Sequence, residues 1–139
     1  MTIHVLVPVH NRADFTRQFL QTLQEQDCDQ LLHVVVIDDG STDHTHQVVR
    51  EFEVDLITGD GSWWWAGSIQ RALTSIRGQI GASDFVYLGN NDTYLAVDHL
   101  TELLRVAKAG PSRVVGSVSN EIWPDGTVNP VSAGFLIDP

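Results

Sequence analysis

The sequence contains few of the features that tie a protein to an oxidising or a membrane environment. Its only cysteine is Cys28, so no disulfide can form within the chain. The first residues lack the basic segment and apolar run of a signal peptide. No apolar stretch approaches the ~18 residues that a membrane-spanning helix requires. We therefore expect no transmembrane segment and a cytoplasmic protein that is at most peripheral at a membrane.

Basic residues are also scarce. The chain has 8 Lys and Arg against 18 Asp and Glu, which gives a formal net charge of −10. A general nucleic-acid binder draws its affinity from basic side chains that neutralise phosphates, so we expect no nucleic-acid partner. A phosphorylated ligand would need positive potential from backbone N–H groups, an isolated arginine or a metal cation.

Apolar runs and helical spacing alternate along the 139 residues, a length typical of one domain. Continuous apolar or β-branched runs predict strands at 3–9, 31–37, 54–58, 85–88 and 113–118, and a last short one at 133–137. Apolar residues at helical spacing predict helices at 13–26, about 43–52, about 66–77 and 97–109. This alternation is typical of a mostly parallel sheet covered on both faces. We expect a single three-layer α/β/α domain over residues 1–139.

Small, polar and acidic residues follow the predicted strands. The first strand ends in Pro8-Val9-His10-Asn11-Arg12, the second in Asp38-Asp39-Gly40-Ser41, and the fourth in Gly89-Asn90-Asn91-Asp92. In open parallel sheets, ligands bind at the carboxyl ends of the strands. The sequence therefore predicts a ligand site at this edge of the sheet.

The acidic residues at this edge have two interpretations. Asp38 and Asp39 precede a glycine, and Asp-Gly is a common turn dipeptide, so both carboxylates could serve the turn itself. A carboxylate at a strand end can equally accept a hydrogen bond from a pyrimidine or a ribose hydroxyl. The segment Asn90–Asp92 is either a loop of turn formers or an oxygen-rich cluster suited to Mg²⁺ or Mn²⁺ on a diphosphate.

Three consecutive tryptophans, Trp63, Trp64 and Trp65, precede a predicted helix. Consecutive residues cannot all face one way, so at least one indole should be exposed or line a pocket, where aromatic faces suit sugars and nucleobases. Ala66 and Gly67 would let a phosphate approach the backbone at the helix start. The alternative is a loop folded down as an additional hydrophobic cluster.

These motifs together resemble those of a known family. The runs VPVHNR, VVVIDDGSTD, a glycine-rich segment with WWWAG, and VYLGNNDTYL occur in this order between residues 3 and 110. The combination resembles the family-2 glycosyltransferases of the GT-A fold, and within them the rhamnosyltransferase-type branch. The resemblance implies inverting, metal-assisted transfer from a UDP- or dTDP-linked sugar to a saccharide or lipid-linked acceptor, in cell-surface polysaccharide biosynthesis.

The resemblance also implies roles for individual residues at the donor site. The residues that would shape the nucleobase pocket are Pro8, Val9, Asn11 and Arg12. Asp39 would accept a hydrogen bond from the base, and Asp38 would lie near the ribose. The residues that would line the ribose and diphosphate are Trp65, Ala66, Gly67 and Gln70.

The segment Asn90-Asn91-Asp92 stands where the family has its Asp-x-Asp motif. Asp92 would be the metal ligand, whereas Asn90 is neutral where the family has an acid. The acids beyond the last predicted helix are Glu121, Asp125 and Asp138, and none lies in a motif that matches the family's catalytic base. We therefore expect a truncated, donor-binding portion of a transferase, with a non-catalytic nucleotide-sugar-binding module as the alternative.

Two other α/β classes fit less well. A receiver-like signalling domain would place its acidic pair after the first strand and a lysine after the fifth. Here the pair follows the second strand, and no lysine lies near Val118. A nucleotidyltransferase would need a basic, glycine-rich first loop, and Pro8–Arg12 is not one.

Overall fold

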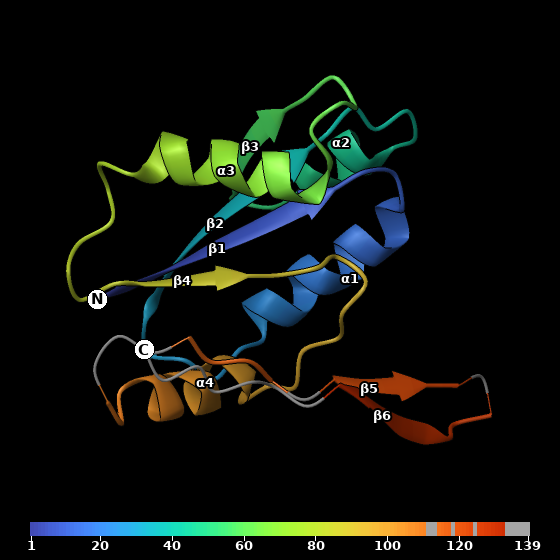
Figure 1. Cartoon of the computed structure of the whole chain (residues 1–139). Coiled ribbons are helices and arrows are strands. Elements are labelled where there is room, and N and C mark those ends of the chain that lie inside the picture. Colours follow the sequence, from blue (N-terminus) through green and yellow to red (C-terminus); the bar gives the residue numbers. More distant parts are fainter. Residues whose placement is uncertain (111–113, 118, 124, 133–139) are drawn as a thin grey trace. The chain divides into compact units, whose positions relative to one another are not determined.

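The computed structural model describes residues 1–110, 114–117, 119–123 and 125–132 (Figure 1). The chain divides into two compact units. The first contains Met1–Glu25 and Asp29–Ala96, and the second contains Gln26–Cys28 and the described residues from Val97 onward. The expectation of one nucleotide-sugar-binding domain over the whole chain stays a prediction.

The first unit is built on a four-stranded sheet. The strands are β1 (Thr2–Val9), β2 (Leu31–Asp38), β3 (Asp55–Thr58) and β4 (Phe85–Leu88), in the order β3-β2-β1-β4. All three neighbouring pairs are parallel, as the continuous apolar runs predicted. Val9 pairs with Asp38 and Asp38 pairs with Thr58, so the first three strands end level with one another.

Helices cover both faces of this sheet, which confirms the predicted layering (Figure 1). α1 (Ala13–Gln24) and α2 (Thr45–Val49) contact each other on one face, and α3 (Trp64–Ile76) lies on the other. The core beneath α3 joins sheet and helix residues, namely Leu6, Val35, Ile37, Ile69, Ala72 and Ile76. Burying one such aliphatic side chain stabilises the fold by about 1.5–3 kcal/mol. This packing holds α3 against the sheet.

All four helices differ in their bounds from the prediction: α1 ends two residues early, and the helix at 97–109 is two residues shorter at each end. α2 begins two residues later than the predicted 43–52, where the carboxylate of Asp43 accepts the N–H and hydroxyl of Thr45. It ends at Val49, and the N–H groups of Glu51 and Phe52 bond the carbonyls of Val48 and Val49 three residues back. α3 begins at Trp64, two positions before the predicted Ala66. Two of the three tryptophans therefore belong to the first turn of α3.

The second unit contains α4 (His99–Ala107) and an antiparallel hairpin of β5 (Ser119–Ile122) and β6 (Val128–Ser132). A turn joins the two strands: Gly126 has φ +84° and donates its N–H to the carbonyl of Trp123 at 2.8 Å. In the part of the chain that the structure describes, no helix is both long and apolar enough to cross a bilayer.

The predicted strand at 113–118 is wrong for its described residues. Residues 114–117 contain an isolated bridge at Val114 and no strand. The backbone N–H and C=O groups of a strand form hydrogen bonds with a neighbouring strand. Here β6 pairs with the polar residues of β5 and not with the apolar run at 114–117. Residues 113 and 118 and the predicted strand at 133–137 lie outside the described residues.

Candidate functional site

A pocket of about 380 Å³ opens at the carboxyl ends of β1 and β2. Its walls come from the end of β1, the residue after β2, the loop before α3 and the first turns of α3. The lining residues are Pro8, Val9, His10, Asp39, Gly61, Trp64, Trp65 and Ser68. The pocket therefore lies at the sheet edge that the sequence predicted.

Asp39 organises the wall of this pocket. Its side chain is only 5% exposed, and both carboxylate oxygens accept backbone N–H groups. Oδ1 accepts the N–H of Gly61 at 2.8 Å, and Oδ2 accepts those of Trp63 and Trp64, each at 2.9 Å. Since a carboxylate oxygen has two lone pairs, Oδ1 keeps one for a further donor. Asp39 thus holds the loop before α3 while it lines the pocket.

The three tryptophans separate into different environments. Trp63 packs against the core beneath α3, and the Arg71 guanidinium lies 4.1 Å from the centre of its ring. Trp64 is 80% exposed and Trp65 is 48% exposed, and both line the pocket. The expectation of an exposed or pocket-lining indole is confirmed, and the hydrophobic-cluster alternative holds for Trp63 alone.

Asp38 has a different environment from Asp39. It is 2% exposed, its Oδ1 accepts the N–H of Ser41 at 3.0 Å, and its Oδ2 lies 3.6 Å from Nδ1 of His46. These contacts fix the loop that leads from β2 towards α2. Asp38 is not among the lining residues of the pocket, and its placement near a ribose stays a prediction.

Asn11 and Arg12 form a left-handed bend after β1, with φ values of 58° and 63°. Such values are uncommon for residues other than glycine. The bend is held from the neighbouring loop: the N–H of Asn11 donates to Oγ of Ser41 at 2.7 Å, and its Oδ1 accepts the N–H of Thr42 at 2.9 Å. The side chain of Asn11 is thus engaged within the protein, and neither Asn11 nor Arg12 is among the lining residues of the pocket.

The segment 90–92 is held by hydrogen bonds from α3 and from the bend after β1. Nε1 of Trp65 donates to Oδ1 of Asn90 at 3.0 Å, and Nη1 of Arg12 donates to Oδ2 of Asp92 at 3.0 Å. Asn91 turns inward and donates from Nδ2 to Oγ1 of Thr16 at 3.0 Å. The hydrogen bond of Trp65 therefore links the predicted Asp-x-Asp position to the pocket.

A metal ion at Asp92 would need ligands beyond this chain's side chains. Among the described residues, no group of three or more His, Cys, Asp and Glu could hold a metal. Mg²⁺ commonly uses one or two carboxylates and takes its remaining ligands from water and phosphate oxygens. Asp92 and Asn90 carry oxygens of the kind that Mg²⁺ prefers, and each already accepts one hydrogen bond within the protein.

A second groove, of about 450 Å³, runs along α3 and shares Trp65 with the pocket. Ala66 and Gln70, which the resemblance assigns to the ribose and diphosphate side, line this groove and not the pocket. Gly67 lies close to the Trp63 side chain, since a Cβ added at this glycine would approach the Cβ of Trp63 to 3.3 Å. Close packing of the helix start is thus a structural reason for glycine there.

The sequence assigned no ligand contact to His10, Gly61 or Ser68, and it did not distinguish Trp64 from the other two tryptophans. His10 follows β1 directly, and its Nδ1 lies 2.6 Å from the carbonyl oxygen of Asp39, so its place at a strand end was the available signal. Ser68 lies one turn after Trp64 on α3. A serine inside a predicted helix gives no sequence signal of a ligand contact.

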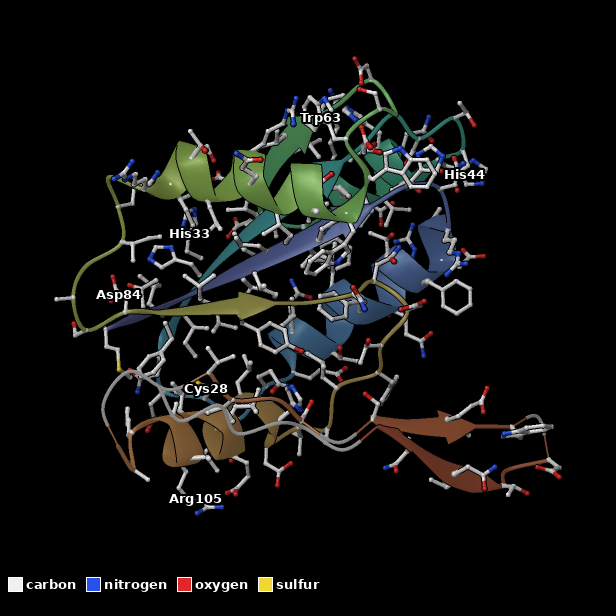
Figure 2. All side chains as sticks on the ribbon, viewed as in Figure 1. Cys28, His33, His44, Trp63, Asp84 and Arg105 are labelled. Carbon is white, nitrogen blue, oxygen red and sulfur yellow. The ribbon has the colours of Figure 1, made fainter. Side chains whose placement is uncertain are left out.

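A polar cluster also lies toward the amino ends of the strands, as Figure 2 shows for His33 and Asp84. Nδ1 of His4 lies 2.9 Å from Nδ1 of His33, and Nε2 of His33 lies 2.9 Å from Asp55. Hydrogen bonds from the N–H groups of Thr2 and Gly81 lower the pKa of Asp84. These contacts tie the sheet together at the end away from the pocket.

Solved structures of sugar-transferring enzymes share this fold. A mannosyltransferase from Pyrobaculum calidifontis, in complex with GDP-Man and Mn²⁺, superposes with a TM-score of 0.71 at 26% identity. The match covers 86% of this chain and 35% of that one. TarS from S. aureus, in complex with UDP-GlcNAc, gives a TM-score of 0.66 at 25% identity and covers 78% of this chain and 32% of that one.

The chain is short relative to these structures, since it spans 20% of a longer TarS structure. A 4-diphosphocytidyl-2C-methyl-D-erythritol synthase has a TM-score of 0.65 at 14% identity, which shows a shared fold and nothing more. No curated protein sequence matches the chain significantly.

The family itself follows from the sequence as a whole. The model of the family described as "Glycosyl transferase family 2" matches residues 4–134, which is nearly the full chain. The match includes β1, the pocket residues after β2, the tryptophan segment and the Asn90–Asp92 loop. The chain therefore belongs to glycosyl transferase family 2.

Proposed function

We propose that this chain binds a nucleotide-diphosphate sugar at the carboxyl edge of its sheet and is the donor-binding portion of an inverting glycosyltransferase. The observation that carries the proposal is the pocket in which Asp39 and two exposed indoles face the same space, next to the Asn90–Asp92 loop. The similar structures bound to UDP-GlcNAc and to GDP-Man with Mn²⁺ support it.

The pocket suits the nucleoside part of such a donor. Trp64 and Trp65 offer aromatic surface for a flat base or a sugar face, and Pro8 and Val9 supply an apolar wall. Asp39 offers one free lone pair to an N–H group of the ligand. We propose that the nucleotide carries uracil or thymine. We also propose, from the tryptophan segment, that the chain belongs to the rhamnosyltransferase-like branch.

The diphosphate would lie beside the Asn90–Asp92 loop. A divalent ion, Mg²⁺ or Mn²⁺, would neutralise the diphosphate there, and Asp92 and Asn90 are the side chains that would hold it. Arg12 competes for Asp92 only weakly, because both partners are about half exposed and such ion pairs contribute about 0–1 kcal/mol. Arg12 is then available to the phosphates as well.

The acceptor in this proposal is a saccharide or a lipid-linked saccharide.

A non-catalytic nucleotide-sugar-binding module is the second candidate function, and one observation favours it. Of the described residues that line the pocket, Asp39 is the only carboxylate, and its oxygens accept three backbone N–H groups. A general base needs an oxygen that can reach the acceptor hydroxyl.

Calorimetric titration tests the donor site. UDP, dTDP and GDP are titrated into the chain with Mn²⁺ and again with EDTA. At least one nucleotide should bind with Mn²⁺, and its affinity should fall by tenfold or more in EDTA. Asp92→Asn should weaken binding with Mn²⁺ and have no effect in EDTA.

Glu53→Gln is the matched control, since it removes one exposed negative charge just before β3, at the amino end of the sheet. It should leave both affinities unchanged. Equal affinity with Mn²⁺ and EDTA would exclude the metal role, and no binding of any nucleotide would exclude the donor site.

A further inference from the structure

We propose that the hydroxyl of Ser68 hydrogen-bonds to the polar edge of the bound nucleobase; the inference rests on the proposed function and names a base-contacting residue within it. Ser68 lies on the first turns of α3 and lines the same pocket as Asp39. Its residue is 0% exposed, and its Oγ has no hydrogen-bond partner among the described residues.

A buried hydroxyl without a partner is unfavourable, and α3 itself offers partners to such groups. Oγ of Ser75 donates to the carbonyl of Ala72 at 2.8 Å, and Oγ1 of Thr74 donates to that of Gln70 at 2.8 Å. Ser68 makes no such bond to its own helix. Ser68 therefore brings to the pocket wall a hydroxyl whose hydrogen-bonding capacity the described residues leave unused.

The chemistry of the pocket indicates which part of the ligand would use this hydroxyl. None of the described residues that line the pocket is a lysine or an arginine, and Asp39 is a carboxylate, so the pocket does not suit the phosphates. Two exposed indoles favour a flat ring. Asp39 can only accept a hydrogen bond, whereas Ser68 can donate one. This pair matches a base edge that presents an N–H group beside a carbonyl oxygen.

Titration of UDP and of uridine into the wild type, Ser68→Ala and Ser75→Ala tests the assignment. Ser68→Ala should weaken the binding of both ligands about tenfold, since it removes one hydrogen bond to a buried ligand group. Ser75→Ala is the matched control on the same helix, because the hydroxyl of Ser75 already donates to a helix carbonyl. It should change the affinity for UDP and for uridine by no more than twofold.

The thermal midpoint separates a ligand contact from a structural role. Ser68→Ala should leave the midpoint of the free protein unchanged or raise it, because no bond within the protein is lost. Ser68→Cys keeps the size of the side chain with a weaker donor and should also lose affinity.

Three results would overturn the inference. If Ser68→Ala binds UDP as tightly as the wild type does, the assignment of Ser68 fails and the proposed function stands. If the loss appears with UDP and not with uridine, the contact is not to the base. If the wild type binds none of UDP, dTDP and GDP, the proposed function fails and this inference with it.

Discussion

Oδ2 of Asp39 accepts the backbone N–H of Trp64 at 2.9 Å, and Trp64 has the left-handed φ of 55° that few residues other than glycine adopt. A carboxylate at the end of β2 thus holds the first residue of α3 in a strained conformation. The same oxygen binds the N–H of Trp63, whose ring packs against the core. One buried acid therefore sets the direction of an exposed indole at the pocket.

Replacing Asp39 with asparagine tests this role. Both oxygens of Asp39 face N–H donors, so the amide nitrogen of Asp39→Asn must face a donor whichever way it is turned. We expect the free energy of unfolding to fall by about 1.5–3 kcal/mol, as for a lost hydrogen bond to a charged group, and UDP binding to be abolished. Urea denaturation and calorimetry measure the two effects.

Asp60→Asn is the control for this substitution. Asp60 is an exposed acid in the same loop, and its contacts are the local ones to the N–H and hydroxyl of Ser62. It should lose well under 1 kcal/mol. The organising role of Asp39 would be refuted by an Asp39→Asn variant that is as stable as Asp60→Asn and still binds UDP.

Gly40 determines how closely the loop after β2 approaches the loop before α3. Its φ is +72°, and a Cβ added there would lie 2.6 Å from the backbone nitrogen of Gly61. Gly40→Ala should therefore lower the free energy of unfolding by roughly 1–3 kcal/mol and weaken nucleotide binding. A Cβ at Gly78 meets no atom within 4 Å, so Gly78→Ala should be close to neutral. Equal stabilities of the two variants would show that the two loops can separate freely.

The position of the site was predictable from the sequence because it depends on strand order. Continuous apolar runs separated by helices indicate a parallel sheet, and the carboxyl ends of such strands meet at one edge. Asp39 and the tryptophan segment could be assigned to that edge without coordinates. The roles of Asp38 and Asp39 could not be separated in this way, because they depend on which backbone N–H groups each carboxylate meets.

Other features depended on contacts that the pattern of residue types does not reveal. Ser68 appears in sequence as an ordinary helix residue, and its missing partner is visible only once the pocket is formed. The early end of α2 depends on hydrogen bonds within its own short segment, which a periodic pattern does not reveal. The apolar run near Val114 predicted a strand, yet the strands that pair in this unit are β5 and β6, which the turn at Gly126 joins.

Asp43 should make stability depend on acid pH. Its carboxylate accepts the hydroxyl and N–H of Thr45 and the N–H of Ala13, and these bonds lower its pKa. Because the folded-state pKa lies below the unfolded value of about 3.9, the stabilisation is complete above that pH and is lost as the pH falls through the folded value.

The difference in the free energy of unfolding between the wild type and Asp43→Asn measures this contribution. Denaturation of the wild type and the variant at pH 7, 5 and 3 should give a stability difference that is constant from pH 7 to 5 and smaller at pH 3. A difference that is the same at all three values would show that the charge of Asp43 does not stabilise the helix starts.

We expect this chain to bind the donor but to transfer its sugar to an acceptor very slowly. Asp39 is the one carboxylate among the described pocket residues, and its hydrogen bonds leave it poorly suited to act as a base. Transfer and donor hydrolysis, followed in parallel with saccharide acceptors, should both be near background. Efficient transfer would show that a base has been missed, and Glu121 and Asp125 would be the first residues to replace.

Mapping the nucleotide on the sheet is the most direct test of the account. In amide and indole N–H NMR spectra recorded during titration with UDP and Mg²⁺, the signals of Gly61, Trp64 and Trp65 should shift most. Those of Thr2, Leu31 and Phe85, at the amino ends of the strands, should stay unchanged. Shifts concentrated at the amino ends, or no shift at the pocket under saturating nucleotide, would contradict a donor site at the carboxyl edge.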